Sequence, residues 1–228
     1  MMEDNSVGAS TSVSSFITSP SFVNKWHHFT GTYSNITGWE FYLDGILSST
    51  SSDTGMVGYS STYLSLRFKN IIPIDEVRIY DRKLTAAEIL TMYNAAKSTD
   101  LSFGAMSTSS LPVSNGLVGH WTLDGETIST TGATTIAQDS VGGNHGTFTN
   151  MSTTTSRVLG KLGQAITFDG TNDYLSGSTS ALLANKPLSV SFWAKSDRAT
   201  GLYQGPLSKQ ITLAGLKGGD FMHGPLPR

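Results

Sequence analysis

The stretch IDEVRIYDRKLTAAEI, residues 74–89, decides the fold, because it changes from a strand pattern to a helix pattern within its own length. Ile74 to Tyr80 alternates as a β-strand does, and the alternation puts Asp75 on the same face as Val77 and Ile79, which should point inward. A carboxylate on a face that points into a core must be paired, hydrogen-bonded or bound to a metal. Asp75 is therefore a candidate site residue.

The second half of this stretch begins a helix. In Thr85-Ala86-Ala87-Glu88, the side chains of Thr85 and Glu88 form a capping box, in which each satisfies an otherwise unpaired N–H group. Ile89, Met92 and Tyr93 follow at helical spacing on one face. The sequence predicts one short helix near 86–95.

Most of the remaining chain repeats with period two between turn residues. Asp44-Gly45 is its strongest hairpin signal. The predicted strands, besides the one above, lie at 26–33, 39–47, 63–68, 117–123, 165–168, 174–176 and 188–194. Many short strands with a single helix predict an all-β protein, an antiparallel β-sandwich or barrel.

Composition excludes several classes of protein. The 228 residues include no Cys, which excludes disulfides, zinc–cysteine sites and thiol catalysis. Charged residues make up only 14% of the chain and the net charge is -2, while 32 Ser and 28 Thr supply much of the polar surface. No basic stripe predicts nucleic-acid binding, and no apolar window is long enough to span a membrane. The polar start of the chain, residues 1–15, lacks the apolar core of a signal peptide.

Several motifs together resemble the laminin-G-like jelly roll of the concanavalin-A-like lectin/glucanase superfamily. The C-terminal half of such a domain is similar to WHHFTGTY at 26–33, FYLDG at 41–45, IDEVRIYDR at 74–82 and LTAAEI at 84–89. The N-terminal half is similar to GLVGHWTLD at 116–124, DSVGGNHG at 139–146, GKLGQA with FDG at 160–170 and the strand at 188–193. The resemblance implies a concanavalin-A-like jelly roll whose two halves stand in reversed order.

The reversed order predicts a domain plan. Residues 1–97 form the C-terminal half, 98–115 a linker, 116–210 the N-terminal half, and 211–228 a disordered or truncated tail. The chain is either cut from a tandem array or closed as a circular permutant. Because a half sandwich would expose an apolar sheet face and a strand edge, intramolecular closure is favoured, with the array as its evolutionary source.

The resemblance implies a noncatalytic binding or adhesion module of a larger extracellular or cell-surface protein, with a glycan or a surface protein as partner. A structural spacer without a ligand and a degenerate glycoside hydrolase relative are the alternatives. The hydrolases of this superfamily carry Glu-x-Asp-x-x-Glu on one strand, and the sequence lacks this pattern. We therefore expect no enzyme activity.

Three carboxylates are candidate metal ligands. They are Asp75, Asp124 at the end of a strand, and Asp139 at the start of a Gly-rich loop. Calcium takes six to eight oxygen ligands, and turns rich in Asp and carbonyl groups supply them. Related jelly rolls often carry one structural calcium, so the resemblance implies calcium as a possible cofactor. The alternative is that these side chains cap turns through backbone N–H groups.

Four aromatic side chains near loops could stack on a sugar ring, with ordinary packing as the alternative: Trp39, Tyr42, Tyr59 and Tyr63. Three other tryptophans lie within strand patterns and are expected in the core: Trp26, Trp121 and Trp193. His27 and His28 are adjacent on a predicted strand, so they face opposite sides and cannot chelate one ion together.

Overall fold

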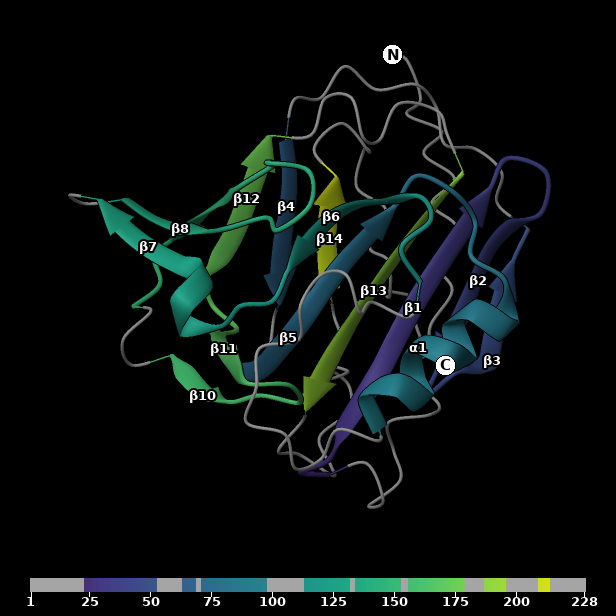
Figure 1. Cartoon of the computed structure of the whole chain (residues 1–228), viewed down its shortest axis with the longest axis horizontal. Helices are drawn as coiled ribbons and strands as arrows, with labels where there is room; N and C mark the ends of the chain where they lie inside the picture. The colour runs from purple at the N-terminus through teal and green to yellow at the C-terminus, as the bar shows by residue number, and fades with distance from the viewer. Residues whose placement is uncertain are drawn as a thin grey trace, which may run out of the picture.

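The computed structural model (Figure 1) describes eight stretches of the chain, which are 23–52, 63–68, 71–97, 113–131, 134–152, 156–178, 187–195 and 209–213. Two antiparallel sheets and one α-helix make up most of this part of the chain. The fold is all-β, a sandwich of the jelly-roll type, as predicted.

The larger sheet has eight strands in the order β10-β11-β5-β13-β1-β2-β3, with β6 paired to β5 beside this path. Its strands are β1 (Trp26–Ser34), β2 (Gly38–Leu43), β3 (Ile46–Ser51), β5 (Ile71–Tyr80), β6 (Leu117–Trp121), β10 (Arg157–Leu159), β11 (Gln164–Asp169) and β13 (Leu188–Lys195).

The smaller sheet has six strands in the order β14-β4-β12-β9-β8-β7. They are β4 (Tyr63–Phe68), β7 (Ile128–Thr131), β8 (Thr134–Ala137), β9 (Gly146–Thr149), β12 (Tyr174–Ser178) and β14 (Lys209–Leu213). β14 crosses the boundary at residue 210 that the sequence suggested for the C-terminal tail.

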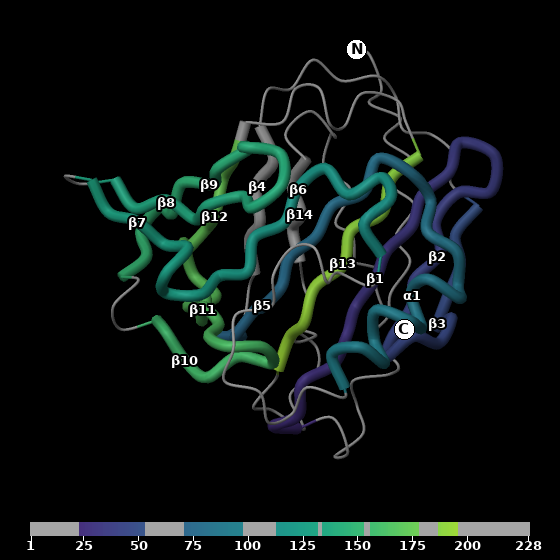
Figure 2. The backbone as a smooth tube through the Cα atoms, in the orientation of Figure 1, coloured from purple at the N-terminus to yellow at the C-terminus, as the bar shows by residue number. Residues whose placement is uncertain are grey.

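Each sheet combines strands from before and after the predicted linker. β5 pairs with β6, β11 and β13, while β13 also pairs with β1. In the smaller sheet β4 lies between β12 and β14. Figure 2 shows this for the larger sheet, where green β13 lies between blue β5 and purple β1. One sandwich is therefore built from the described residues on both sides of the predicted linker.

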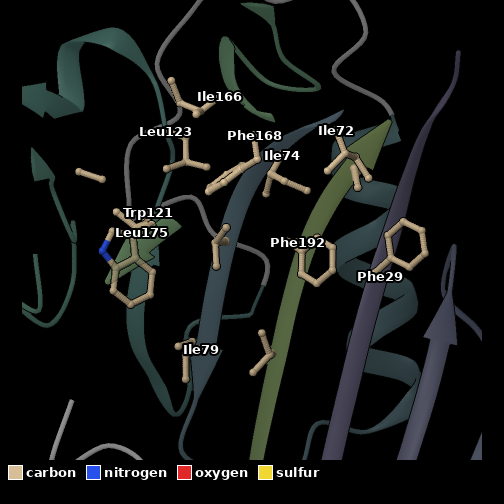
Figure 3. Packing of buried hydrophobic residues seen from close by; sticks show 14 of the residues in the cluster. Phe29, Ile72, Ile74, Ile79, Trp121, Leu123, Ile166, Phe168, Leu175 and Phe192 are labelled. Carbon is tan, nitrogen blue, oxygen red and sulfur yellow. The ribbon is translucent and has the colours of Figure 1, made fainter. Parts of the chain in front are cut away.

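The main core lies between the two sheets (Figure 3). The larger sheet contributes residues such as Ile79, Trp121 and Phe192, and the smaller sheet contributes Phe148 and Leu175. All five side chains are less than 9% exposed. Since the core draws on both sheets and both segments, each depends on the others for burial of its apolar face.

The helix α1 (Ala86–Lys97) forms where the capping box predicts it. Thr85 Oγ1 accepts a hydrogen bond from Glu88 N at 3.3 Å, and Glu88 Oε2 accepts one from Thr85 N at 2.9 Å. In Figure 1, α1 lies across β1 and β3. Its apolar face forms a second, smaller core on the outer face of the larger sheet, with these buried members: Tyr42, Tyr80, Leu84, Ile89, Met92 and Val113. Val113 belongs to this core, so the last residues of the predicted linker are part of the folded structure.

Candidate functional site

A β-bulge in β5 reverses the facing of Asp75. Asp75 and Arg78 oppose Trp193 and Ser191 on β13, so β5 has one residue more than its partner between these two points. Glu76 takes up the extra residue with a positive φ of 55°. The prediction that Asp75 faces inward with Val77 was wrong, because unbroken alternation does not pass through a bulge. The residue that shares the core with Val77 is Ile74.

The bulge places a network of buried polar side chains on the outer face of the larger sheet. The Glu76 carboxylate forms an ion pair with the Arg78 guanidinium, and its Oε2 atom lies 2.8 Å from Nε2 of His120. Nδ1 of His120 lies 3.1 Å from the Oγ atom of Ser140. Glu76, Arg78 and His120 are at most 7% exposed, whereas Ser140 is exposed. The chain of contacts therefore leads from a buried ion pair to a surface hydroxyl.

Electrostatics keep Glu76 ionised in this position. Burial alone would raise its pKa, but the Arg78 charge and the hydrogen bond with His120 hold the pKa of Glu76 below its ordinary value. A buried ion pair of this kind costs desolvation free energy, and its main effect is to fix which groups lie together. Sequence reasoning missed the network, because its members come from β5, β6 and the loop after β8.

Asp75 holds the turn between β10 and β11. Its Oδ2 atom accepts hydrogen bonds from Lys161 N at 2.7 Å and from Leu162 N at 2.9 Å. Its Oδ1 atom is buried and has no hydrogen-bond partner among the described residues. Burial raises the pKa of Asp75 well above its ordinary value, and the negative charge of Glu76 raises it further.

Asp124 holds the same turn from its other side. Its Oδ1 atom accepts a hydrogen bond from Gln164 N at 2.6 Å, and burial raises its pKa. Gly163 adopts φ of 61°, and a Cβ atom there would lie 2.3 Å from Asp124 Oδ1. The structure thus brings two of the three predicted metal ligands, Asp75 and Asp124, to one short turn.

Asp139 is the acceptor at the centre of the loop between β8 and β9. Its two carboxylate oxygens accept backbone N–H groups from His120, Val141, Gly142 and Asn144, at 2.8 to 3.0 Å. Burial would raise the pKa of Asp139, but these hydrogen bonds lower it. Each predicted carboxylate accepts backbone N–H groups at a turn, which is the capping role that the sequence left open. In the described part of the chain, no three His, Asp or Glu side chains gather as a metal site would require.

The aromatic candidates do not form one surface. The Tyr42 ring is buried under α1 and its hydroxyl donates to Glu40, so its face is covered. Trp39 is half-buried beside Tyr33 and the main core. Tyr63 begins β4, but its side chain lies outside the described part of the structure, as does all of Tyr59.

An aromatic cluster on the outer face of the larger sheet was not predicted. Trp193 lies with its ring centroid 5.1 Å from that of His28 and 5.8 Å from that of Tyr93 on α1. Nε2 of His28 lies 2.7 Å from the Oγ atom of Ser191, and burial lowers the pKa of His28 to about 3. Trp193 is buried as expected, but it packs outside the main core, whereas Trp121 lies within it.

The family comparison decides the classification of the first segment. A laminin-G-like family model, described as the concanavalin A-like lectin/glucanases superfamily, matches residues 3–90. Residues 3–90 are thus similar to domains of this superfamily. No curated protein and no solved structure matches the chain significantly.

The superfamily segment contains β1 to β5 and the start of α1, together with the bulge at Glu76. It therefore supplies Asp75, Glu76 and Arg78 to the buried polar groups described above. Residues outside the matched segment supply His120, Asp124 and Asp139. Among the described residues, no helix is long and apolar enough to cross a membrane.

Proposed function

We propose that the chain is a noncatalytic binding module of an extracellular or cell-surface protein, and that it recognises a glycan through the loop at 139–145. The superfamily assignment supports a binding module, because domains of this kind often serve that role. The observation that carries the choice of loop is the set of hydrogen bonds on Asp139, which fixes the loop's backbone from within.

A loop fixed in this way loses little conformational entropy when it binds a ligand. Most of its side chains are exposed, among them the Ser140 hydroxyl and the His145 imidazole, whose Nδ1 accepts a hydrogen bond from Asp139 N at 3.1 Å. Hydroxyl and imidazole groups of this kind can form hydrogen bonds with the hydroxyl groups of a sugar. The low charge of the chain, with a net charge of -2, also favours an uncharged ligand.

The burial of Asp75 and Glu76 argues against hydrolysis at this pair of carboxyl groups. Glycoside hydrolysis needs two carboxyl groups that flank the scissile bond. Asp75 and Glu76 have opposite pKa shifts, as an acid and a base would, but they are only 0% and 5% exposed. A sugar ring cannot reach them, and both are engaged in holding the fold.

The proposal is tested on a glycan array with three proteins. They are the natural chain, a variant with Ser140→Ala and His145→Ala, and a control with the exposed edge residues Thr50→Ala and Ser129→Ala. We expect the loop variant to bind its glycans about tenfold more weakly, since about two hydrogen bonds are lost, and the control to bind as the natural chain does.

Each binding experiment is repeated with calcium and with a chelator, which separates ligand recognition from any metal requirement. Binding to no glycan would favour the spacer alternative. Binding that the loop variant keeps would move the site elsewhere on the sandwich.

A further inference from the structure

The two segments that flank residues 98–112 depend on each other for a complete sheet. In the described part of the larger sheet, β5 and β1 of the first segment meet only through β13 of the second. In the smaller sheet, β4 of the first segment lies between two strands of the second. Neither segment can therefore form the observed sheets without the other.

The contact between the segments is extensive and regular. β1 and β13 pair continuously from Trp26↔Lys195 to Tyr33↔Leu188. On the face toward the main core, the rings of Phe29 and Phe192 stack with centroids 5.6 Å apart across this same pair of strands. A segment that lacks its complement exposes open strand edges and an apolar sheet face, which is a template for another chain.

We propose that two copies of this chain exchange their segments, so that the first segment of one copy closes a sandwich with the second segment of the other. Each strand pairing in the exchanged dimer would be the one already present in the closed chain, so the exchange costs little free energy. In the exchanged dimer, residues 98–112 would connect the two sandwiches. Fifteen residues reach about 50 Å when extended, which is enough to cross to a neighbouring sandwich.

A second copy is the partner that the chain itself specifies. Its second segment has the matching register for β1, β4 and β5, which an unrelated protein would lack. The net charge of -2 leaves little repulsion between copies. The absence of Cys means that no disulfide locks the closed form. This inference concerns assembly, and it stands independently of the proposed glycan site.

The absence of Cys also provides the test. Thr30 and Ser191 are buried, small and directly opposite on β1 and β13, at a spacing that suits a disulfide. One chain carries Thr30→Cys and another carries Ser191→Cys. The two are unfolded, refolded together at high concentration and oxidised. The control replaces the second chain with one that carries Ser129→Cys, on the exposed part of β7.

Exchange predicts about tenfold more disulfide-linked heterodimer from the matched chains than from the control chains, because pairing raises the effective concentration of the two thiols. A single chain with both substitutions, refolded dilute, should form the bond within itself and so shows that the geometry permits it. Heterodimer at the control level would overturn the proposal.

Light scattering of the unsubstituted chain measures its oligomeric state and so tests the exchange without any introduced cysteine. After refolding at high concentration, exchange predicts a dimer that persists on dilution and returns to monomer only after unfolding. A sample that is monomeric at every refolding concentration would contradict the exchange.

Discussion

Val77 on β5 and Trp121 on β6 are Cα partners on neighbouring antiparallel strands, although the whole linker separates them in sequence. Both are about 1 to 2% exposed and both lie in the main core. Contacts of such long sequence range form late and make folding slow, because the chain must close a long loop before they can form.

Truncation of a buried residue in this core should be costly. Ile79 is fully buried, so Ile79→Ala should lower the free energy of unfolding by about 2–5 kcal/mol through lost burial and a cavity. Leu159→Ala is the matched control, since Leu159 is 75% exposed and its truncation should change stability by less than about 0.5 kcal/mol. Urea unfolding followed by tryptophan fluorescence measures both. Equal effects would mean that the core does not lie where the structure has it.

Neither segment should fold alone. We expect residues 1–97 and 113–228, expressed separately, to aggregate or to show no cooperative unfolding. Each segment alone exposes the strand edges that pair with the other segment in the intact chain. A mixture of the two should recover the β-sheet circular dichroism of the intact chain. Two independently folded, monomeric segments would instead support the account of a fragment cut from a tandem array.

The parts of the fold that sequence anticipates are those with local causes. The capping box of Thr85 and Glu88 fixes the start of α1. Asp44 and Gly45 both have positive φ, as the hairpin signal requires. The facing of Asp75 was predicted wrongly because the bulge puts Glu76 at a positive φ, which Glu rarely adopts and which no neighbouring residue indicates.

The candidate site could be anticipated only in part, for the same reason. The three carboxylates were identified individually: Asp75 from its place in a strand pattern, Asp124 from the end of a strand and Asp139 from the start of a Gly-rich loop. Their partners were not, because Asp75 accepts N–H groups from residues more than eighty positions away. That the two halves of an ancestral domain stand here in reversed order remains a proposal. The combination of strands from both segments within each sheet is compatible with it.

Removal of the Glu76 charge should destabilise the protein at neutral pH. Glu76→Gln leaves the Arg78 guanidinium buried without its counter-charge, at a cost of about 3–5 kcal/mol. The pKa of Glu76 in the folded state lies below its ordinary value of 4.5. Its stabilisation is therefore fully present above pH 4.5 and is lost as the pH falls through the folded pKa.

The difference between the natural chain and Glu76→Gln should accordingly shrink in acid. Urea midpoints between pH 3 and pH 7 measure it. The matched control is Glu126→Gln, an exposed residue whose substitution should leave the midpoints unchanged. A difference that stays constant in acid would show that shape, and not charge, makes Glu76 important.

The neighbouring acid should show the opposite pH dependence. The pKa of Asp75 is raised above its ordinary value of 3.8, so the folded state binds the proton more tightly and stability falls as the pH rises from 3.8 through the folded pKa. Asp75→Asn is neutral at every pH and keeps an oxygen acceptor for Lys161 N and Leu162 N. We expect Asp75→Asn to be more stable than the natural chain at pH 8, and Asp75→Ala to be less stable at all pH values. A less stable Asp75→Asn would contradict this account.

Calcium binding is a separate prediction for Asp75 and Asp124. If the unpartnered Oδ1 atom of Asp75 and the Asp124 carboxylate take a calcium ion, the native state gains about 2.7 kcal/mol at a hundredfold excess over Kd. The melting temperature should then rise with calcium and fall with chelator in the natural chain but not in Asp75→Asn. The Glu126→Gln variant should respond as the natural chain does. A melting temperature that calcium and chelator leave unchanged would assign these carboxylates to turn capping alone.

The extra residue of β5 makes the length of this strand as important as its composition. Ile74 and Val77 are an odd number of positions apart, yet both point into the main core. Deletion of Glu76 would leave these two residues two positions apart, so simple alternation alone would keep both in the main core. The bulge would be lost, however, and with it the buried ion pair with Arg78. A deletion at this point therefore changes the buried polar network and not the apolar core, and descendants of this sequence should keep the extra residue wherever they keep Arg78 and His120.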